Sequence, residues 1–295
     1  MIYENKDCVD FLKSLQDRSM DLIILDPPYY KVVNDDWDNQ WFTIDKYLSW
    51  CQEWISEVSR VSKMSASLWI FGFPQQLSYL LPILESAGFT FRQQIVVNKG
   101  LQAVAGRTSN KLKMFPTATE SIFFFHREAR NQIRDILQSE VKRLNLNGAK
   151  VNAHLGKAIT GGGAFACMAS IKKPLEHRVY PTKQDWLKLQ EIMSLPKYED
   201  YVYKFNLQPG LTDVWDDINF YDRKEKKIHS TQKPIKLIDR LIACSSNEND
   251  NVLDIFAGSA TTAISCIKQN RNFFGCEKDE NYFVLSNQRI SDFGA

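Results

Sequence analysis

The stretch Leu22–Tyr29, LIILDPPY, carries an apolar strand directly into an aspartate, two prolines and a tyrosine. A continuous apolar run is typical of a strand buried on both faces, as in a parallel sheet covered by helices. Pro27 and Pro28 fix their own φ angles and keep the residue before each of them extended. We therefore expect a stiff strand exit at which the carbonyl groups of Asp26 and Pro27 point in set directions.

Such a strand exit suits the binding of an amine. Asp26 offers a carboxylate acceptor, and carbonyl groups that are already oriented accept a hydrogen bond at little entropic cost. The ring of Tyr29 offers a face for a nucleobase, a contact worth about 1–3 kcal/mol. The plainer interpretation is a proline turn capped by an aspartate, which explains an isolated DPP but not the second site described below.

Strands and helices alternate at both ends of the chain. Near the N-terminus the expected strands are DLIIL, SLWIF, QIVV and SIFFFH, with helices between the first three; near the C-terminus they are NVLDIF and NFFGCE, with helices KPIKLIDRLIACSS and SATTAISCIKQ. The strands QIVV and SIFFFH are close in sequence, as in an antiparallel pair. We therefore predict one α/β layer, a mostly parallel sheet with one antiparallel strand and helices on both faces.

Residues 127–212 interrupt this rhythm with glycines and polar residues, which divides the chain into residues 1–126, 127–212 and 213–295. The middle segment holds 14 Lys or Arg against 8 Asp or Glu, so it carries about +6, whereas the rest of the chain is mildly acidic. This balance suits a polyanion such as nucleic acid, although a solvated basic face would look the same.

The overall composition is that of an ordinary soluble protein, with 44% apolar and 24% charged residues in a chain of 295. The start lacks the pattern of a signal peptide, and no apolar run approaches the roughly 18 residues of a membrane span. We expect a cytoplasmic protein. Six scattered cysteines and four distant histidines predict buried reduced thiols and no metal site.

A second unusual strand end is DIFAGSATT, residues 254–262, where a strand meets a helix through a small-residue turn. Glu277 lies 19 residues after Gly258, at the end of the next expected strand. A glycine turn lets a ligand approach the backbone, and such an acid can bind ribose hydroxyls. The G-x-G-x-x-G pattern is absent, which favours a nucleoside without a pyrophosphate and argues against a nicotinamide dehydrogenase.

Acceptors beside an aromatic plate and a nucleoside site are what the methylation of a nucleobase amine requires. The lone pair of such an amine is conjugated with the ring, so the amine must be held with that lone pair facing the sulfonium methyl of S-adenosylmethionine. Orientation and electrostatics in a water-poor pocket would supply most of the catalysis.

The sequence resembles the S-adenosylmethionine-dependent amino-methyltransferases of DNA, specifically their permuted β group. DPPY (Asp26–Tyr29) resembles motif IV, DIFAGSATT resembles motif I, and HSTQKPIKLIDRLI (His229–Ile242) is similar to motif X. Together the matches span about two thirds of the chain. The resemblance implies a Rossmann-like fold with circularly permuted motif order, in which residues 1–126 form the catalytic half, 127–212 an inserted target-recognition region and 213–295 the cofactor-binding half.

The resemblance also implies roles for individual residues. The catalytic set is Asp26, Pro27, Pro28 and Tyr29. The cofactor set is Asp7, Cys8, Asp26, Thr231, Lys233, Asp254, Phe256, Gly258, Ser259, Thr261 and Glu277. The family usually has glycine where this chain has Ala260 and proline where it has Ile255. If position 260 requires φ > 0, alanine is strained there by roughly 1 kcal/mol or more.

In this family the DPPY motif usually accompanies methylation of the N6 of adenine, in a base flipped out of duplex DNA. The basic segment then supplies the DNA contacts, for which the candidates are Arg127, Arg130, Arg134, Lys142, Arg143, Lys172, Lys173 and Arg178. Trp37 and Trp41 are candidate wedges or core anchors, and Thr160–Gly163 a hinge. Alternatives left open are N4 of cytosine, an RNA or nucleoside substrate, and a DNA-binding module with decayed catalysis. Some members of the family pair as dimers, so a homodimer is a further candidate, and a setting in restriction and modification, regulation or a phage stays open.

Overall fold

The computed structural model describes residues 1–30, 40–105, 113–159, 163–222, 225, 227–229 and 231–294. The chain divides into two compact units, which are described separately. The first combines Met1–Arg127 with Lys204–Ala295, and the second is Glu128–Tyr203. The segment that the sequence set apart, 127–212, is thus longer than the second unit, because Arg127 and residues 204–212 belong to the first.

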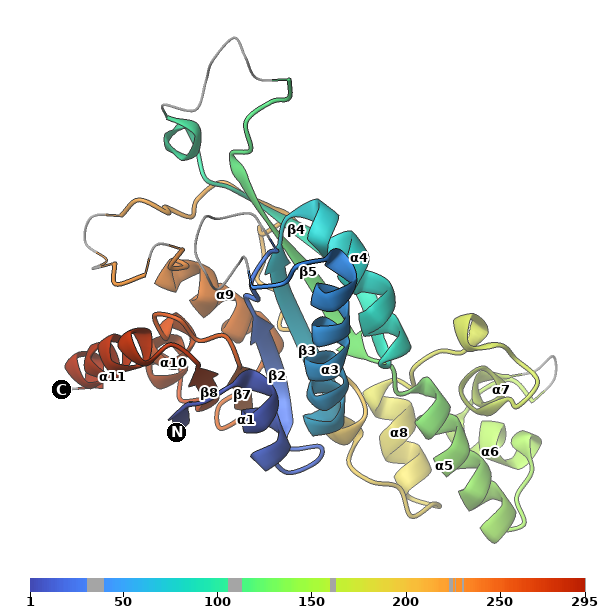
Figure 1. The fold of residues 1–295 in the computed structure, drawn as a ribbon. Coiled ribbons are helices and arrows are strands. Elements are labelled where there is room, and N and C mark those ends of the chain that lie inside the picture. The colour runs from blue at the N-terminus through green and yellow to red at the C-terminus, as the bar shows by residue number, and fades with distance from the viewer. Residues whose placement is uncertain are drawn as a thin grey trace. The chain divides into compact units, whose positions relative to one another are not determined.

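The first unit is built on an eight-stranded sheet (Figure 1). Its strands, in spatial order, are β1 (Ile2–Asn5), β8 (Asn272–Glu277), β7 (Asn251–Asp254), β2 (Met20–Leu25), β3 (Ser62–Gly72), β5 (Thr119–Arg127), β4 (Phe89–Asn98) and β6 (Val214–Trp215). β5 runs antiparallel to β3 and β4, and every other pairing in the sheet is parallel. Among the described residues this confirms the predicted parallel sheet with one antiparallel strand.

The two ends of the chain meet in the middle of this sheet. β2 pairs with β7 in parallel, with Leu22 opposite Val252 and Ile23 opposite Leu253. From this pair the chain proceeds outward in both directions, from β2 to β3 and from β7 to β8. Ligands of open α/β sheets bind beyond the carboxyl ends of strands at such a switch point. The DPPY exit after β2 and the glycine turn after β7 therefore lie side by side in the sheet, although they are far apart in the sequence.

Helices cover both faces of the sheet (Figure 1). One face packs against α1 (Cys8–Ser14), α3 (Ile44–Val61) and α4 (Pro74–Ser86), whose buried side chains include Phe11, Tyr47 and Trp54. The other face lies against α9 (Ile235–Ser245) and α10 (Thr261–Lys268), where Nε1 of Trp69 donates to Oγ of Ser245 at 2.9 Å. α11 (Glu280–Gly294) packs beside α10. The strands are covered on both sides, which explains their continuous apolar sequences.

The second unit is helical. It contains α5 (Arg130–Arg143), α6 (Gly148–Leu155), α7 (Ala164–Ala169) and α8 (Lys183–Gln190), together with short 3-10 turns at Leu175–His177 and Tyr198–Asp200. A third 3-10 turn, Leu101–Val104, belongs to the first unit. The core of the helical unit buries apolar side chains from all four helices: Ile133, Leu137, Val151, Leu155, Phe165, Met168, Trp186 and Leu189.

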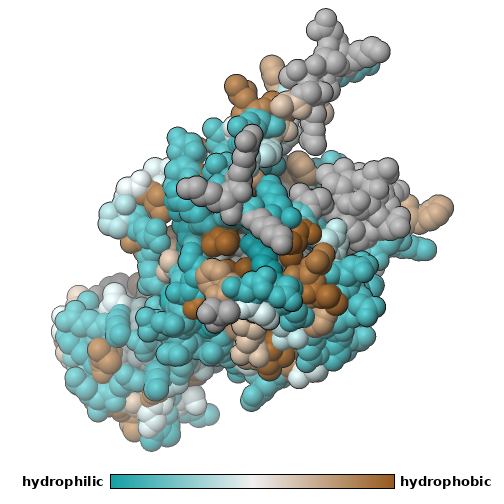
Figure 2. All heavy atoms as spheres, turned by 90° about the vertical axis from the view of Figure 1, so that its left-hand side faces the viewer, coloured by the Kyte–Doolittle hydropathy of each residue, from teal (hydrophilic) through white to brown (hydrophobic). Residues whose placement is uncertain are grey.

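Within the described ranges, no helix is long and apolar enough to cross a membrane. Figure 2 shows a face on which hydrophilic residues predominate and hydrophobic residues occur in smaller groups. In the same ranges, no group of three or more His, Cys, Asp or Glu side chains is arranged to hold a metal ion. All six cysteines are free thiols, and five of them are buried.

Candidate active site

The carboxyl edge of the sheet opens into a cavity of about 1010 Å³ within the first unit. Its walls include the DPPY exit after β2, the turn after β7 and the end of β8. Because β5 is antiparallel, its first residues lie at this same edge, and Glu120 also lines the cavity. One cavity therefore contacts both of the sites that the sequence singled out.

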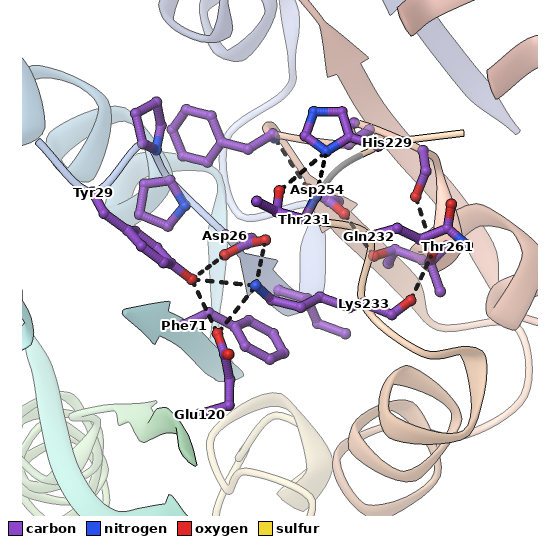
Figure 3. Close-up of a pocket in the computed structure, with 18 of the residues that line it drawn as sticks. Asp26, Tyr29, Phe71, Glu120, His229, Thr231, Gln232, Lys233, Asp254 and Thr261 are labelled. Carbon is purple, nitrogen blue, oxygen red and sulfur yellow. Dashed lines mark hydrogen bonds and ion pairs between the residues drawn. The ribbon is translucent and has the colours of Figure 1, made fainter. Parts of the chain in front are cut away.

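At the DPPY end, Asp26 lies in a cluster of charged and hydroxyl groups (Figure 3). Nζ of Lys233 is 2.9 Å from Oδ2 of Asp26 and 3.1 Å from Oε1 of Glu120. The Tyr29 hydroxyl donates to Oδ1 of Asp26 at 2.5 Å and lies 3.3 Å from both Glu120 and Lys233. Lys99 completes the cluster with an ion pair to Oε2 of Glu120 at 3.0 Å. Two carboxylates and two ammonium groups thus balance each other's charge.

The charges in this cluster are stabilised by one another. Burial alone raises the pKa of Glu120, but Lys233 and Lys99 outweigh burial and hold that pKa below its ordinary value. Burial likewise lowers the pKa of Lys233, but Asp26 and Glu120 outweigh it and raise that pKa. For Tyr29, burial and then the neighbouring carboxylates raise the pKa well above 10. Lys233 and Glu120 are therefore charged near neutral pH, and the Tyr29 hydroxyl keeps its proton.

The backbone of the DPPY stretch is anchored to α3. The Tyr47 hydroxyl donates to the carbonyl of Pro28 at 2.8 Å, and Tyr47 itself is fully buried. The ring of Tyr29 lies edge-on to Phe73, with the ring centres 5.5 Å apart. These contacts add to the stiffness that the two prolines impose, so the exit is fixed before any ligand arrives.

At the other end, the turn after β7 faces the last residue of β8. Oε2 of Glu277 accepts a hydrogen bond from the N–H of Gly258 at 2.8 Å, and Oε1 accepts from the N–H of Asp279 at 2.8 Å. Gly258 has φ +51°, a left-handed conformation that glycine adopts without strain. The ring of Phe256 packs against Trp50 and Trp54 at centre distances of 5.8 and 5.5 Å. This places an acid, a close backbone and an aromatic face around one part of the cavity.

Two acids of this region are hard to ionise. Asp254, the last residue of β7, is buried, and burial raises its pKa to about 7 although Thr262 and the N–H of Phe256 donate to it. Burial also raises the pKa of Glu277, against the hydrogen bonds that it accepts from Asp279 and Gly258.

The remaining cofactor candidates fall into two groups. Asp7, Ser259, Thr261 and Thr231 line the cavity, as does Cys8. Asp7 also caps α1, since its Oδ1 accepts from the N–H of Val9 at 3.0 Å. Lys233, which the resemblance places in the cofactor set, has its side chain directed to the DPPY end instead. Its carbonyl accepts from Thr261 at 3.2 Å, but its ammonium group contacts Asp26 and Glu120.

Ala260 has a left-handed backbone conformation, which is the condition under which the sequence predicts strain at this position. Its φ is +54° and its ψ is +36°, and it is fully buried at the start of α10. A methyl group costs roughly 1–2 kcal/mol in this region of backbone space. The strain expected of an alanine in place of the family's usual glycine is therefore present.

Sequence reasoning missed Glu120 and Lys99. Both belong to the antiparallel hairpin, Lys99 just after β4 and Glu120 near the start of β5. A signal was available in the sequence, since TESIFFFH places an acid, Glu120, near the start of a mostly apolar strand. Its meaning depended on the strand direction, which places the start of β5 beside the ends of the parallel strands.

Of the two interpretations left open for Trp41, wedge or core anchor, the structure favours the anchor, because this side chain is only 9% exposed. Its ring packs against Trp50 and Tyr47 at centre distances of 4.6 and 5.0 Å, so it anchors the chain to the core. Trp37 lies outside the described residues, and so does most of the Thr160–Gly163 segment that the sequence indicated as a hinge.

Two of the candidate DNA contacts serve the fold instead. Arg127 donates to Ser59 and to the carbonyl of Ala87 at 2.6 and 2.7 Å. Arg178 is 6% exposed and donates to Asn131 and to the carbonyl of Lys173. Guanidinium groups held in this way are not presented to a phosphate, so both assignments are corrected.

The other six candidates are in the second unit. Lys142 and Lys172 are exposed. Arg130, Arg134 and Arg143 form ion pairs with Glu128, Asp135 and Glu140 respectively. Lys173 is half-buried, with its ammonium group 3.3 Å from the Cys167 sulfur.

The fold and the site together define a Rossmann-like methyltransferase with S-adenosylmethionine as its cofactor. The profile of one family, described as DNA methylase of the N6 and N4 type, matches residues 20–288. The chain therefore belongs to this family of DNA amino-methyltransferases.

Three relatives show how far the similarity extends. The Type II methyltransferase M1.MboII of Moraxella bovis is 29% identical over 97% of this chain and 96% of its own length. The DNA adenine methyltransferase YhdJ of Escherichia coli (strain K12) is 28% identical over 96% of this chain and 80% of its own. The crystal structure of the M1.HpyAVI–SAM complex aligns with a TM-score of 0.57 at 19% identity, covering 98% of both chains.

Proposed function

We propose that this protein transfers a methyl group to the N6 amine of an adenine flipped out of duplex DNA. The observation that carries the proposal is the convergence of Asp26–Tyr29, Gly258 and Glu277 on one cavity. The choice of adenine is supported by the DPPY motif and by the similarity to a relative named as a DNA adenine methyltransferase. The family as a whole covers both N6 and N4 methylation.

The donor set of the cavity fits S-adenosylmethionine, which when bound supplies an electrophilic methyl group on its sulfonium. The Glu277 carboxylate accepts hydrogen bonds from hydroxyls such as those of ribose, and the Phe256 ring offers an apolar face to the adenine moiety. Gly258 presents backbone without a side chain. Asp7 and the backbone of Cys8 are proposed for the adenine amine, and Ser259, Thr261 and Thr231 for the amino-acid end. Asp254 supports this wall from beneath through its bonds to Thr262 and Phe256.

The residues of the DPPY exit would hold the target. Asp26 and the carbonyl of Pro27 accept the two N–H groups of the adenine amine, which directs its lone pair out of the ring plane. Pro28 keeps that carbonyl fixed through its anchor on Tyr47. The Tyr29 ring stacks on the flipped base, which offsets part of the few kcal/mol that leaving the duplex costs. Formation of the new N–C bond would be matched by breakage of the methyl–sulfur bond, which leaves S-adenosylhomocysteine, and the amine would release one proton beside the Asp26 carboxylate.

The second unit, Glu128–Tyr203, is proposed as the target-recognition region. Its exposed Lys142 and Lys172 suit phosphate contacts, which position a protein on DNA without reading sequence. Arg130, Arg134, Arg143 and Lys173 would join them by exchanging their present partners for phosphates. A cytoplasmic location and a setting in restriction and modification are part of the proposal, and the similarity to Type II methyltransferases supports the second.

The proposal is tested by incubating the purified chain with duplex DNA and methyl-labelled S-adenosylmethionine, then digesting the DNA to nucleosides. Labelled N6-methyladenine is expected from the wild type, and a loss of about 100-fold or more in rate from Asp26→Ala. Asp10→Ala, an exposed acid on α1, is the matched control. An unlabelled digest, or equal labelling by wild type and Asp26→Ala, would refute the proposal.

The same digest separates the alternatives. N4-methylcytosine in place of methyladenine would establish cytosine as the target. Labelling of RNA but not of DNA would show that the substrate is RNA. A DNA-binding module with decayed catalysis would bind DNA without binding the cofactor, which calorimetry with S-adenosylmethionine measures directly. Light scattering of the free protein and of its DNA complex tests whether a homodimer is the working form.

A further inference from the structure

The ammonium group of Lys233 is held in one position by several groups at once. Its three N–H groups have three oxygen partners: Asp26 at 2.9 Å, Glu120 at 3.1 Å and the Tyr29 hydroxyl at 3.3 Å. Below it lies the ring of Phe71, with its centre 5.1 Å from Nζ. Lys99 fixes Glu120 from the far side at 3.0 Å. Side-chain exposure of Lys233 is 10%, so the charge is oriented inside the cavity wall (Figure 3).

The Tyr29 hydroxyl shows which kind of group satisfies Asp26 and Lys233 together. It donates to Oδ1 of Asp26 at 2.5 Å and accepts from Nζ of Lys233 at 3.3 Å. Asp26 and Lys233 therefore present an acceptor next to a donor. The complementary partner is a donor next to an acceptor, which is the pattern of an amino group beside an unprotonated ring nitrogen.

Adenine has this pattern at its N6 amine and N1, and cytosine has it at its N4 amine and N3. At the corresponding positions of the Watson–Crick edge, guanine (O6 and N1) and thymine (O4 and N3) have the reverse pattern, a carbonyl beside a ring N–H. Their carbonyl oxygen would face the Asp26 carboxylate, and their N–H would face an ammonium group. Both contacts would leave a buried polar group without a partner, which is how a polar site rejects a near relative of its ligand.

We propose that Lys233 recognises the target base by donating a hydrogen bond to the ring nitrogen beside the methylated amine, N1 when the base is adenine. The base takes the place of the Tyr29 hydroxyl between Asp26 and Lys233, and the Tyr29 ring turns to stack on it. Glu120, held by Lys99, is a positioning residue that fixes the direction of the Lys233 ammonium group. This inference rests on the proposed function and adds the group that selects an amino base.

The contact with N1 acts on binding. A positive group at N1 draws electron density away from the conjugated amine, so it does not make that amine a better nucleophile. An interaction that is equally strong before and during the reaction changes KM and leaves kcat nearly unchanged. A hydrogen bond to a charged donor contributes about 10- to 100-fold in affinity. A structural role for Lys233 would give no such dependence on one atom of the base.

The test replaces that single atom in the substrate. Duplexes of the methylated site carry adenine or 1-deazaadenine, in which a C–H replaces N1 and the amine is retained. Binding is measured by fluorescence anisotropy with S-adenosylhomocysteine present, and KM and kcat are measured where turnover occurs. Wild type is expected to lose about 10- to 100-fold in affinity for the deaza duplex. Lys233→Met is expected to bind the two duplexes within about threefold of each other, because the interaction is already absent.

Lys233→Met leaves two carboxylates without their shared cation, which destabilises a buried cluster. The double variant Lys233→Met/Glu120→Gln removes one of these charges and is expected to show the same indifference to N1. Thermal unfolding and cofactor binding verify that both variants are folded. Glu120→Gln alone keeps Lys233 but removes one of the charges that orient its ammonium group. The loss of affinity for the deaza duplex is therefore expected to lie between those of wild type and Lys233→Met. Lys236→Met, an exposed lysine of α9 with 58% side-chain exposure, should retain the full wild-type sensitivity.

The outcomes separate this inference from the proposed function. If wild type does not methylate natural duplex DNA, the proposed function fails. If it does, but the deaza base weakens binding by the same factor in wild type and in both Lys233 variants, only the role of Lys233 is refuted. If Glu120→Gln keeps the full wild-type sensitivity, the positioning role of Glu120 is refuted. If the methylated base is cytosine, 3-deazacytosine is the corresponding probe.

Discussion

The Thr262 hydroxyl, in the first turn of α10, donates a 2.6 Å hydrogen bond to Oδ2 of Asp254, the last residue of β7. The other oxygen accepts from the N–H of Phe256 at 3.0 Å. Both donors are neutral, and burial outweighs them, so the pKa of Asp254 rises to about 7. The carboxyl group beneath the proposed cofactor wall therefore titrates near neutral pH.

The raised pKa of Asp254 predicts a pH-dependent contribution to stability. The folded state binds the proton more tightly than the unfolded chain, whose pKa is 3.8, so the contribution is complete below pH 4 and is lost as pH rises through 7. Asp254→Asn cannot ionise. The free energy of unfolding of wild type relative to this variant should fall by about 2–3 kcal/mol between pH 5 and pH 8.

Urea unfolding of both proteins at several pH values measures this difference, and the comparison cancels the titration of other groups. A difference that stays constant or grows with pH would contradict the assignment.

Replacement of Ala260 by glycine should stabilise the protein. The left-handed backbone at φ +54° costs alanine roughly 1–2 kcal/mol, whereas the greater freedom of glycine in the unfolded chain costs about 0.5–1 kcal/mol. Ala260→Gly is therefore expected to raise the free energy of unfolding by up to about 1 kcal/mol. The matched control is Ala263→Gly in α10, which removes a helical alanine and should lower stability by about 1 kcal/mol or more. Equal destabilisation by both changes would show that position 260 is not strained.

Glu277 should affect cofactor binding more than catalysis. Its two oxygens face the N–H groups of Gly258 and Asp279, and an amide in its place turns a donor toward one of them. Glu277→Gln is expected to weaken S-adenosylmethionine binding by about 10- to 100-fold in calorimetry, with kcat at saturating cofactor within a few fold of wild type. Glu280→Gln, an exposed acid at the start of α11, should bind the cofactor normally. Unchanged affinity in Glu277→Gln would rule out the ribose contact.

Substitutions of Lys142 and Lys172 should affect DNA binding, whereas substitution of Arg178 should affect the stability of the second unit. Lys142→Ala and Lys172→Ala remove exposed charges, so each is expected to lower DNA affinity on any sequence and to reduce the slope of log K against log salt by about 1. Their unfolding should match that of wild type. Arg178→Met removes the donor to Asn131 and to the Lys173 carbonyl and should lower the thermal midpoint. A normal midpoint with reduced DNA affinity in Arg178→Met would restore it as a DNA contact.

Much of the fold was readable from local pattern. Continuous apolar strands, the helix beginning near Pro234 and the short spacing of QIVV and SIFFFH each predict an element whose type does not depend on distant residues. The second unit was less readable, because three of its four helices have eight residues or fewer, and a helix that short shows little periodicity. Its first residue, Glu128, lies one residue from the limit that the composition indicated, whereas its last residue, Tyr203, is set by packing and not by a composition shift.

The sequence alone indicated the candidate chemistry at the two strand ends, because the prolines of Asp26–Tyr29 and the small-residue turn at Gly258 restrict their own local backbone. The tertiary structure decided what surrounds them. Pairing of β2 with β7 and reversal of β5 bring Asp26, Lys233 and Glu120 together, although they lie on three separate segments. Local sequence restricts the conformation of a few neighbouring residues. Only the closed sheet fixes the distance between charges far apart in the chain, and that distance decides which acid is ionised and which ammonium group faces the target.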